Sequence, residues 1–262
     1  MKVRVISDVH LEFENDKSFH PGTGEVLILA GDICTACDFG FGNKNEEIYL
    51  NFFEECVKGY DKVFYTLGNH EHYNFDITKT EETLKKYLPK GITLLNNSSE
   101  YYNGVHFVGT TLWADFKNGN PVIMDNAQRC MSDYHCITKD GKELTPKDTL
   151  KLHDESVEWL MQALPMLRGH VVVFSHHAPS LQSNQGYREP ELVGAYCTDL
   201  TRLIEHHPNV VKWVHGHVHK SSNYNIEQCN VIANPRGYNN YKLNEEFTTT
   251  SEFEVTKLQI TY

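Results

Sequence analysis

The stretch VFYTLGNHEHY, residues 63–73, places an amide, an imidazole and a carboxylate directly after a short apolar run. Residues 63–65 are typical of a buried β-strand, and Gly68 ends that run. Ligands of open α/β sheets bind at the carboxyl ends of strands, so Asn69 and His70 lie where a binding or catalytic site is expected. Asn can offer a neutral oxygen to a cation, and His can bind a metal ion or transfer protons. A polar turn explains this stretch equally well when it is taken alone, so the other strands must decide.

Four further apolar runs end in the same way. Residues 3–6 form a β-branched run. Asp8 and His10, shortly after it, are expected to point to the same side because side chains alternate along a strand. The runs 25–30, 171–174 and 210–214 also stop at acids or histidines. Asp, Asn and His recur at all five ends, which predicts a metal site there. The residues concerned are Asp8 and His10, Asp32, Asn69 and His70, His176, and His217 and His219.

The order of apolar segments predicts an α/β fold. Helical spacing favours helices at 47–58, 80–87, about 145–164 and 198–206. Strands are also expected at 92–95 and 105–109, with a hairpin turn at Asn103-Gly104. The strands expected at 224–226 and 231–233 form a second hairpin, and 253–260 is expected to be an edge strand. We expect one domain over residues 1–262.

Residues 112–147 have few periodic signals and several Gly and Pro. The segment is too long for a plain connection, so it is predicted to be an irregular insertion or cap draped over the site.

Composition limits the partners. The 262 residues are 40% hydrophobic and 23% charged, and the formal net charge is −11. An acidic chain repels a long polyanion, so long duplex nucleic acid is disfavoured as a partner, while small phosphoesters and short oligonucleotides stay possible.

No apolar leader and no apolar run of about 18 residues is visible, so we expect a cytoplasmic protein without membrane association. Seven cysteines, an odd number, are expected to be reduced, and the Cys34–Cys37 spacing lacks the second pair that a zinc site needs.

The predicted ligands narrow the chemistry. Mixed carboxylate, imidazole and amide ligands suit borderline divalent ions. Seven ligands exceed one tetrahedral site and divide over two ions that share a carboxylate. Paired ions about 3.5–4 Å apart are the usual arrangement for phosphoryl transfer. We expect two divalent ions, Mn²⁺ first, with Fe, Zn, Co or Ni as alternatives.

The blocks D-x-H, G-D, G-N-H-[D/E], a lone H and G-H-x-H occur in this order between residues 8 and 219. As a set they resemble the signature of the calcineurin-like metallophosphoesterase superfamily. The resemblance implies a four-layer α-β-β-α sandwich of two mixed β-sheets flanked by helices. It implies a dinuclear metal-dependent phosphoric ester hydrolase that uses a metal-bridged hydroxide. By the same resemblance, one ion is held by Asp8, His10, Asp32 and His219, with Asp32 bridging, and the other by Asn69, His176 and His217.

His70 matches the histidine of the family that protonates the leaving group or steadies the phosphoryl oxygens. Protein phosphatases of the superfamily carry G-D-x-x-D-R-G, whose second Asp orients that histidine. Here Thr35 stands at this position and no Arg-Gly follows, which argues against a protein serine/threonine phosphatase. Glu71 or Asp38 is the expected substitute.

Substrate contacts are predicted at Asn69 and at Arg236, a bidentate phosphate ligand unless it is only a surface-loop arginine. Tyr73, Tyr187 and Arg188 are weaker pocket candidates. The expected substrate is a small or nucleotide-like phosphodiester or phosphomonoester.

Two alternatives remain. A nuclease on short or single-stranded nucleic acid would use aromatic side chains of the insertion, although no basic run accompanies them. The aromatic residues that a nuclease would use are Trp113, Phe116 and Tyr134. A non-catalytic scaffold is disfavoured because every predicted metal ligand is kept. The sequence leaves the oligomeric state open.

Overall fold

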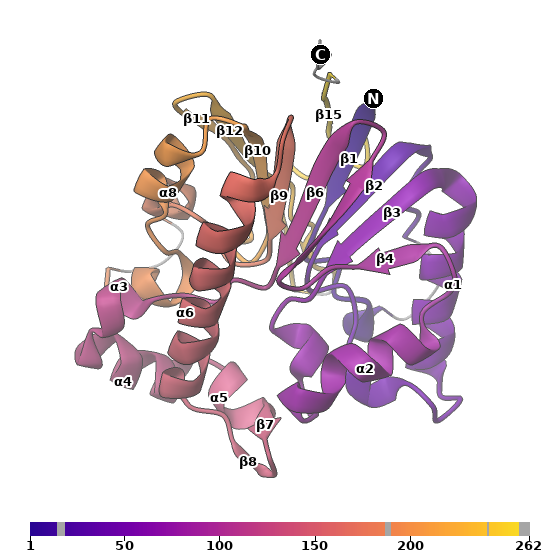
Figure 1. Cartoon of the computed structure of the whole chain (residues 1–262). Helices are drawn as coiled ribbons and strands as arrows, with labels where there is room; N and C mark the ends of the chain where they lie inside the picture. The colour runs from indigo at the N-terminus through magenta and orange to yellow at the C-terminus, as the bar shows by residue number, and fades with distance from the viewer. Residues whose placement is uncertain (15–18, 187–189, 240, 257–262) are drawn as a thin grey trace.

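The computed structural model describes residues 1–14, 19–186, 190–239 and 241–256 (Figure 1). Two mixed sheets pack face to face. One has the strand order β15 (Glu252–Glu254), β1 (Lys2–Ile6), β2 (Gly24–Ala30), β3 (Tyr60–Thr66) and β4 (Ile92–Leu94). The other has the order β11 (Ser222–Ile226), β12 (Cys229–Ala233), β10 (Val210–His215), β9 (Val171–Ser175), β6 (Val105–Thr110) and β5 (Ser98–Tyr102).

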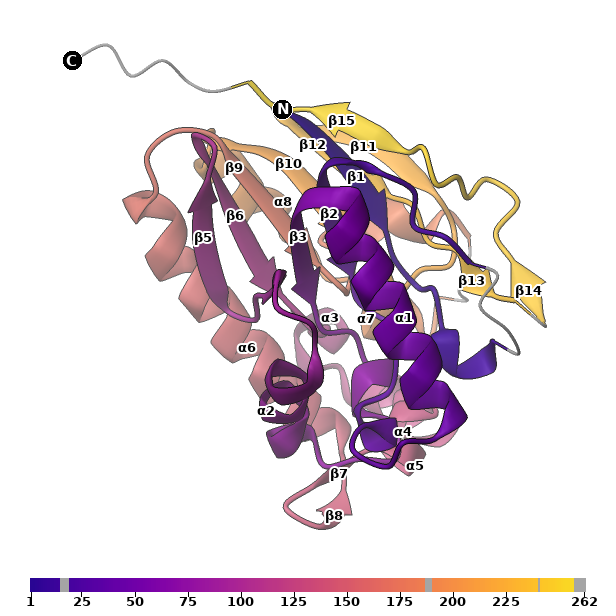
Figure 2. The same ribbon diagram turned by 90° about the vertical axis from the view of Figure 1, so that its right-hand side faces the viewer.

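The inner strands of both sheets run parallel, and antiparallel strands close three of the four edges. Strands β1 to β4 are parallel, and β15 pairs antiparallel with β1. Strands β12, β10, β9 and β6 are parallel, and β11 and β5 are antiparallel to their neighbours. Figure 2 shows the N-terminus and β15 side by side. The carboxyl ends of the parallel strands therefore lie together at one end of each sheet.

Helices cover the outer faces and give the predicted four layers. Helix α1 (Lys44–Gly59) packs on the first sheet, with α2 (Ile77–Tyr87) at its lower end, and α6 (Pro146–Ala163) and α8 (Thr201–His206) lie on the second (Figure 1). Successive side chains of a strand point to opposite faces. Accordingly Val26 and Ile28 pack between the two sheets, while Leu27 and Leu29 pack under α1. Strands buried on both faces explain the continuous apolar runs.

Side chains outside the apolar pattern set the starts of the helices. Asn43 accepts a hydrogen bond from the Glu46 amide, and Asp76 accepts one from the Thr78 amide, so α1 and α2 each start three residues before the predicted position. Thr145 and Asp148 form a capping box at the start of α6, as its Thr-Pro start predicts.

Three predicted elements need correction. The Asn103-Gly104 turn joins β6 to β5 and not to the strand predicted at 92–95, which is β4 of the other sheet. Strand β5 was missed because its sequence, SSEYY, is a polar edge strand without an apolar run. Helix α8 begins at Thr201, and Asp199 precedes it and accepts from the Thr201 amide. The edge strand predicted at 253–260 is present as β15, which ends at Glu254; residues 255 and 256 are not part of a strand, and 257–260 lie outside the described residues.

The segment 112–147 is more regular than predicted. It forms α3 (Phe116–Gly119), α4 (Pro121–Cys130), α5 (Asp133–Cys136) and a ribbon of β7 (Thr138–Lys139) with β8 (Lys142–Glu143), all beyond the sheet ends in Figure 1. They pack with α7 (Val193–Tyr196) around their own apolar cluster. The aromatic residues that a nuclease would use are core residues of that part of the fold. Trp113, Phe116 and Tyr134 are 4%, 1% and 2% exposed.

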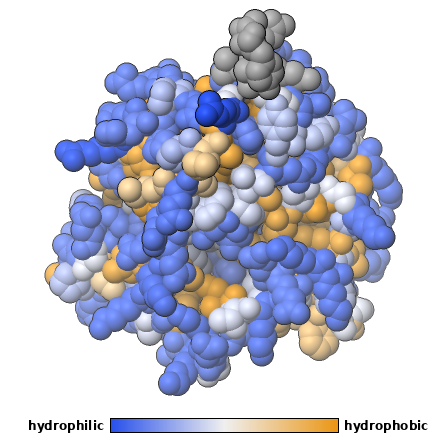
Figure 3. Space-filling model, in the orientation of Figure 1, coloured by the Kyte–Doolittle hydropathy of each residue, from blue (hydrophilic) through white to orange (hydrophobic). Residues whose placement is uncertain are grey.

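The face drawn in Figure 3 is largely hydrophilic, and its apolar side chains form separate patches. None of the described helices combines the length and the apolar character needed to cross a membrane. The seven cysteines are free thiols.

Candidate metal centre

The structure brings all seven predicted ligand residues together at the carboxyl ends of the parallel strands. Asp8, His10 and His219 place ligand atoms within 4.8 Å of one another, and Asp32, His176 and His217 form a second such group. Asn69 adjoins the second group, since its Oδ1 lies 2.9 Å from Nε2 of His176. Each group has the donor types that divalent transition ions prefer.

Asp32 belongs to the second group and also approaches the first. Its Oδ2 is 3.8 Å from Nε2 of His10, and its Oδ1 is 3.4 Å from Nε2 of His176. One oxygen thus faces each group, which is the position that a bridging carboxylate needs.

The backbone that carries these side chains is left-handed at four non-glycine residues. The φ angles are 53° at Asp8, 53° at His10, 55° at Asp32 and 65° at His217. Such conformations cost on the order of 1–3 kcal/mol each and persist where surrounding contacts enforce them. Here Asp8 Oδ1 accepts from the His217 amide at 2.9 Å, and Asp32 Oδ1 accepts from the His70 amide at 2.8 Å. The strained turns therefore aim the side chains inward.

Two glycines of the sequence blocks are required by close contacts. A Cβ at Gly68 would lie 2.2 Å from Oδ1 of Asp32, and a Cβ at Gly216 would lie 2.7 Å from Oδ2 of Asp8. The G-N-H and G-H-x-H blocks thus need glycine because any side chain would displace a carboxylate of the centre.

Hydrogen bonds to Nδ1 leave Nε2 of two histidines for an ion. Nδ1 of His176 donates to the Ala30 carbonyl at 2.9 Å, and Nδ1 of His10 lies 3.1 Å from Oε1 of Glu12. Partners of this kind fix the tautomer and the orientation of metal-binding histidines.

An orphaned oxygen shows that the residues fit a cation. Oδ2 of Asp8 is buried and has no hydrogen-bond partner among the described residues. Such an oxygen is costly unless positive charge compensates it. Burial alone would raise the pKa of Asp32, but the positive charges of His176 and His70 hold that pKa well below its ordinary value. Asp32 is therefore available in its carboxylate form.

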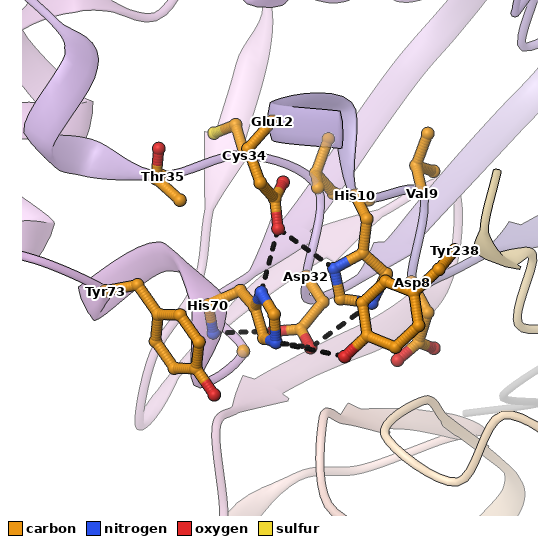
Figure 4. A network of polar contacts seen from close by, with 12 residues as sticks. Asp8, Val9, His10, Glu12, Asp32, Cys34, Thr35, His70, Tyr73 and Tyr238 are labelled. Carbon is orange, nitrogen blue, oxygen red and sulfur yellow. Dashed lines mark hydrogen bonds and ion pairs between the residues drawn. The ribbon is translucent and has the colours of Figure 1, made fainter. Parts of the chain in front are cut away.

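His70 lies beside His10 and Asp32 and is held from three directions (Figure 4). Its Nδ1 is 2.8 Å from Oε1 of Glu12, and the Tyr73 ring stacks on it at 4.0 Å. Its Nε2 is 3.4 Å from the Tyr238 hydroxyl. Burial would lower the pKa of His70, but the charges of Asp32 and Glu12 raise it to about 9 in the metal-free protein.

The residue that orients His70 is Glu12, and neither sequence candidate takes that place. Glu71 accepts from the backbone amides of Asp32, Ile33 and Gly68 and from the Tyr65 hydroxyl, so it supports the loop behind the centre. Asp38 binds Thr35, Asn43, Asn45 and Tyr49. The sequence signal that could have identified Glu12 is its place two residues after His10.

A hollow of about 200 Å³ opens over the centre. None of the described residues that line it is Lys or Arg, and the segment 112–147 supplies one wall. The lining residues that this segment contributes are Cys130, Met131, Ser132 and Asp133. A larger hollow of about 650 Å³ lies beside it and shares Tyr238 with it.

A family model for calcineurin-like phosphoesterases matches residues 1–221. The chain belongs to the calcineurin-like phosphoesterase family. This assignment supports a metal-dependent phosphoesterase and agrees with the sandwich of two mixed sheets.

Relatives of this phosphoesterase cover almost its whole length. Uncharacterized protein L509 of Acanthamoeba polyphaga mimivirus is 26% identical over 273 residues, which are 92% of this chain and 93% of that protein. The crystal structure of phosphopantetheinyl hydrolase from Mycobacterium tuberculosis superposes with a TM-score of 0.68 at 17% identity, over 90% of this chain and 89% of that one. TT1561 of Thermus thermophilus gives a TM-score of 0.50 at 10% identity, over 89% and 88%. At these identities, the two structures support the fold alone.

Arg236 of the phosphoesterase is buried and not a surface-loop residue. Its side chain forms an ion pair with Glu14, donates to the Val9 carbonyl at 3.2 Å and lies over the Phe19 ring. Among the described residues it does not line the hollow over the centre. Its role as a phosphate ligand stays a prediction. Tyr73 lines that hollow, whereas Tyr187 and Arg188 lie outside the described residues.

Proposed function

We propose that the chain hydrolyses a small phosphodiester with two divalent ions, Mn²⁺ first among them. Asp8, His10, Asp32 and His219 would hold one ion, and Asp32, Asn69, His176 and His217 the other. The observation that carries this proposal is the position of Asp32, whose two oxygens face different groups of ligand atoms. The orphaned Asp8 oxygen supports a cation in the first group.

The bound ions would supply Lewis acidity, lowering the pKa of water and offsetting the charge of the phosphoryl oxygens. His70 would donate a proton from Nε2 to the leaving oxygen, since Nδ1 is held by Glu12 and Nε2 lies near Asp32 and Tyr238, which line the hollow. The Glu12 carboxylate stabilises the protonated ring and keeps it from rotating. Tyr73, stacked on the other side, limits the tilt of the ring.

Charge in the hollow favours a diester over a monoester. A monoester dianion carries one more negative charge than a diester and gains most from an additional cationic side chain. The described lining offers no Lys or Arg and includes the Asp133 carboxylate. The guanidinium of Arg236 is already paired with Glu14.

The adjoining hollow of about 650 Å³ gives room for the organic group of the substrate. It is lined by Phe13, Tyr238 and Tyr241 together with Glu12, Glu14, Lys44 and Asn45. Aromatic walls suit a planar or apolar group such as a nucleobase. A nuclease is the weaker alternative, because the aromatic residues of the insertion are buried and the net charge is −11.

The test is hydrolysis of bis-p-nitrophenyl phosphate and of p-nitrophenyl phosphate, in Mn²⁺ and in EDTA. We expect diester turnover that needs the metal, exceeds monoester turnover and disappears in Asp32→Ala. Turnover of the monoester alone would contradict the diester assignment. No turnover of either compound, or of a panel of nucleotide diesters, with metal bound would favour the scaffold alternative.

A further inference from the structure

Asp133 is a buried carboxylate that the segment 112–147 brings to the metal centre. It is the first residue of α5 and is 1% exposed. Its Oδ1 accepts hydrogen bonds from Nδ2 of Asn69 at 2.7 Å and from the Tyr73 hydroxyl at 2.8 Å. Asn69 and Asp133 are 64 residues apart in the sequence, so tertiary structure alone creates this contact.

The contact decides which end of the Asn69 amide faces the metal site. An amide has a donor end and an acceptor end, and the hydrogen-bond network fixes its orientation. With Nδ2 held by the carboxylate, Oδ1 points to the other side and lies 2.9 Å from Nε2 of His176. The reversed amide would place two oxygens against each other. Asp133 therefore presents the oxygen of Asn69 to the second ligand group.

The same carboxylate oxygen holds Tyr73, whose ring lies flat against His70. The ring centroids are 4.0 Å apart with an interplanar angle of 21°. Without Asp133, the Tyr73 hydroxyl would lose its 2.8 Å hydrogen bond and keep the longer, 3.4 Å contact with Nδ2 of Asn69. One carboxylate is thus connected to a ligand of the second group and to the ring that supports His70.

We infer that Asp133 is a positioning residue that fixes Asn69 as a metal ligand and holds Tyr73 against His70. This inference rests on the proposed function, since it assigns a role toward the ions proposed above. It also gives the segment 112–147 a role in the centre, because this segment supplies the carboxylate that holds Asn69 and Tyr73. Partners in that layer change metal affinity about 10–100-fold when they are removed.

The experiment is calorimetric titration of the metal-free protein with Mn²⁺, so that the readout does not depend on turnover. We expect Asp133→Ala to weaken one of two Mn²⁺ sites by about 10–100-fold and to leave the other unchanged. Asp133→Asn can still accept both bonds through its amide oxygen and should recover most of the affinity. Asp125→Ala removes an exposed carboxylate of the neighbouring helix α4 and should bind like the wild type.

A double-mutant cycle separates positioning from general stability. Because Asp133 acts through Asn69, Asp133→Ala should cause little further loss in an Asn69→Ala background. Equal losses in both backgrounds, or two wild-type Mn²⁺ sites in folded Asp133→Ala, would overturn the inference. If Asp133→Ala does not fold, Asp133→Leu, which keeps the volume, takes its place with the same expected result. Failure of the proposed hydrolysis in the wild type would leave this binding result intact.

Discussion

Oε1 of Glu12 lies 2.8 Å from Nδ1 of His70 and 3.1 Å from Nδ1 of His10. A single carboxylate thus fixes two imidazoles, one directed at the first ligand group and one at the hollow. Burial alone would raise the pKa of Glu12, but hydrogen bonds and charge from the two histidines lower it to about 2. The two imidazoles therefore favour the ionised form of Glu12.

Glu12→Gln should lower kcat by about 10–100-fold with a smaller change in KM, because the protonated form of His70 loses its ionic partner. Steady-state kinetics with bis-p-nitrophenyl phosphate at saturating Mn²⁺ measures the effect. Glu55→Gln, an exposed carboxylate paired with His20, is the matched control. An unchanged kcat in Glu12→Gln would rule out the orienting role.

His70→Ala should slow the hydrolysis of a substrate more strongly the more basic its leaving group is. Loss of a general acid costs about 10²–10⁴-fold when the leaving oxygen is an alkoxide, whereas p-nitrophenolate needs little protonation. Rates for an alkyl nucleotide diester, followed by chromatography, are compared with those for bis-p-nitrophenyl phosphate. Equal losses for the two substrates would mean that His70 does not protonate the leaving group.

The clustering of the residues proposed as metal ligands could be predicted from the sequence because each residue closely follows an apolar run. A parallel strand fixes where its next residues lie, so Asp32 and Asn69 could be placed without knowing the rest of the fold. Glu12 follows the left-handed turns at Asp8 and His10, and no periodicity reports such turns.

Contacts distant in the sequence escaped prediction for a different reason. Asp133 reaches Asn69 across 64 residues, and Arg236 pairs with Glu14 across 222 residues. Neither partner has a local signal, and only the packing of the segments brings them together. Strand β5 was missed because an exposed edge strand does not need apolar residues.

Glu71→Gln should destabilise the protein by about 1.5–3 kcal/mol, because a buried carboxylate that accepts several hydrogen bonds is replaced by a group with one acceptor. Urea unfolding in EDTA measures the free energy of unfolding without a contribution from metal. Glu54→Gln breaks only an exposed pair with Lys58 and should change stability by about 0.5 kcal/mol or less. Equal stabilities of the two variants would show that Glu71 does not support the loop.

His153 should make the fold less stable in acid. Burial lowers the pKa of His153, whose Nδ1 lies 3.1 Å from the Leu112 carbonyl. As the pH falls through about 6.5, the unfolded chain binds a proton there that the folded chain does not, so the free energy of unfolding decreases. We expect the loss of unfolding free energy between pH 7.5 and pH 5 to be smaller in His153→Gln than in the wild type. Identical pH dependence in both proteins would contradict this assignment.

The most direct test of the central claim is the Mn²⁺ stoichiometry of the wild type and of Asp32→Asn, measured by calorimetry together with diester turnover of the same samples. We expect two ions per wild-type chain, turnover that EDTA abolishes and Mn²⁺ restores, and the loss of both paired binding and turnover in Asp32→Asn. Wild-type turnover by Asp32→Asn, or by the EDTA-treated protein, would contradict the dinuclear centre.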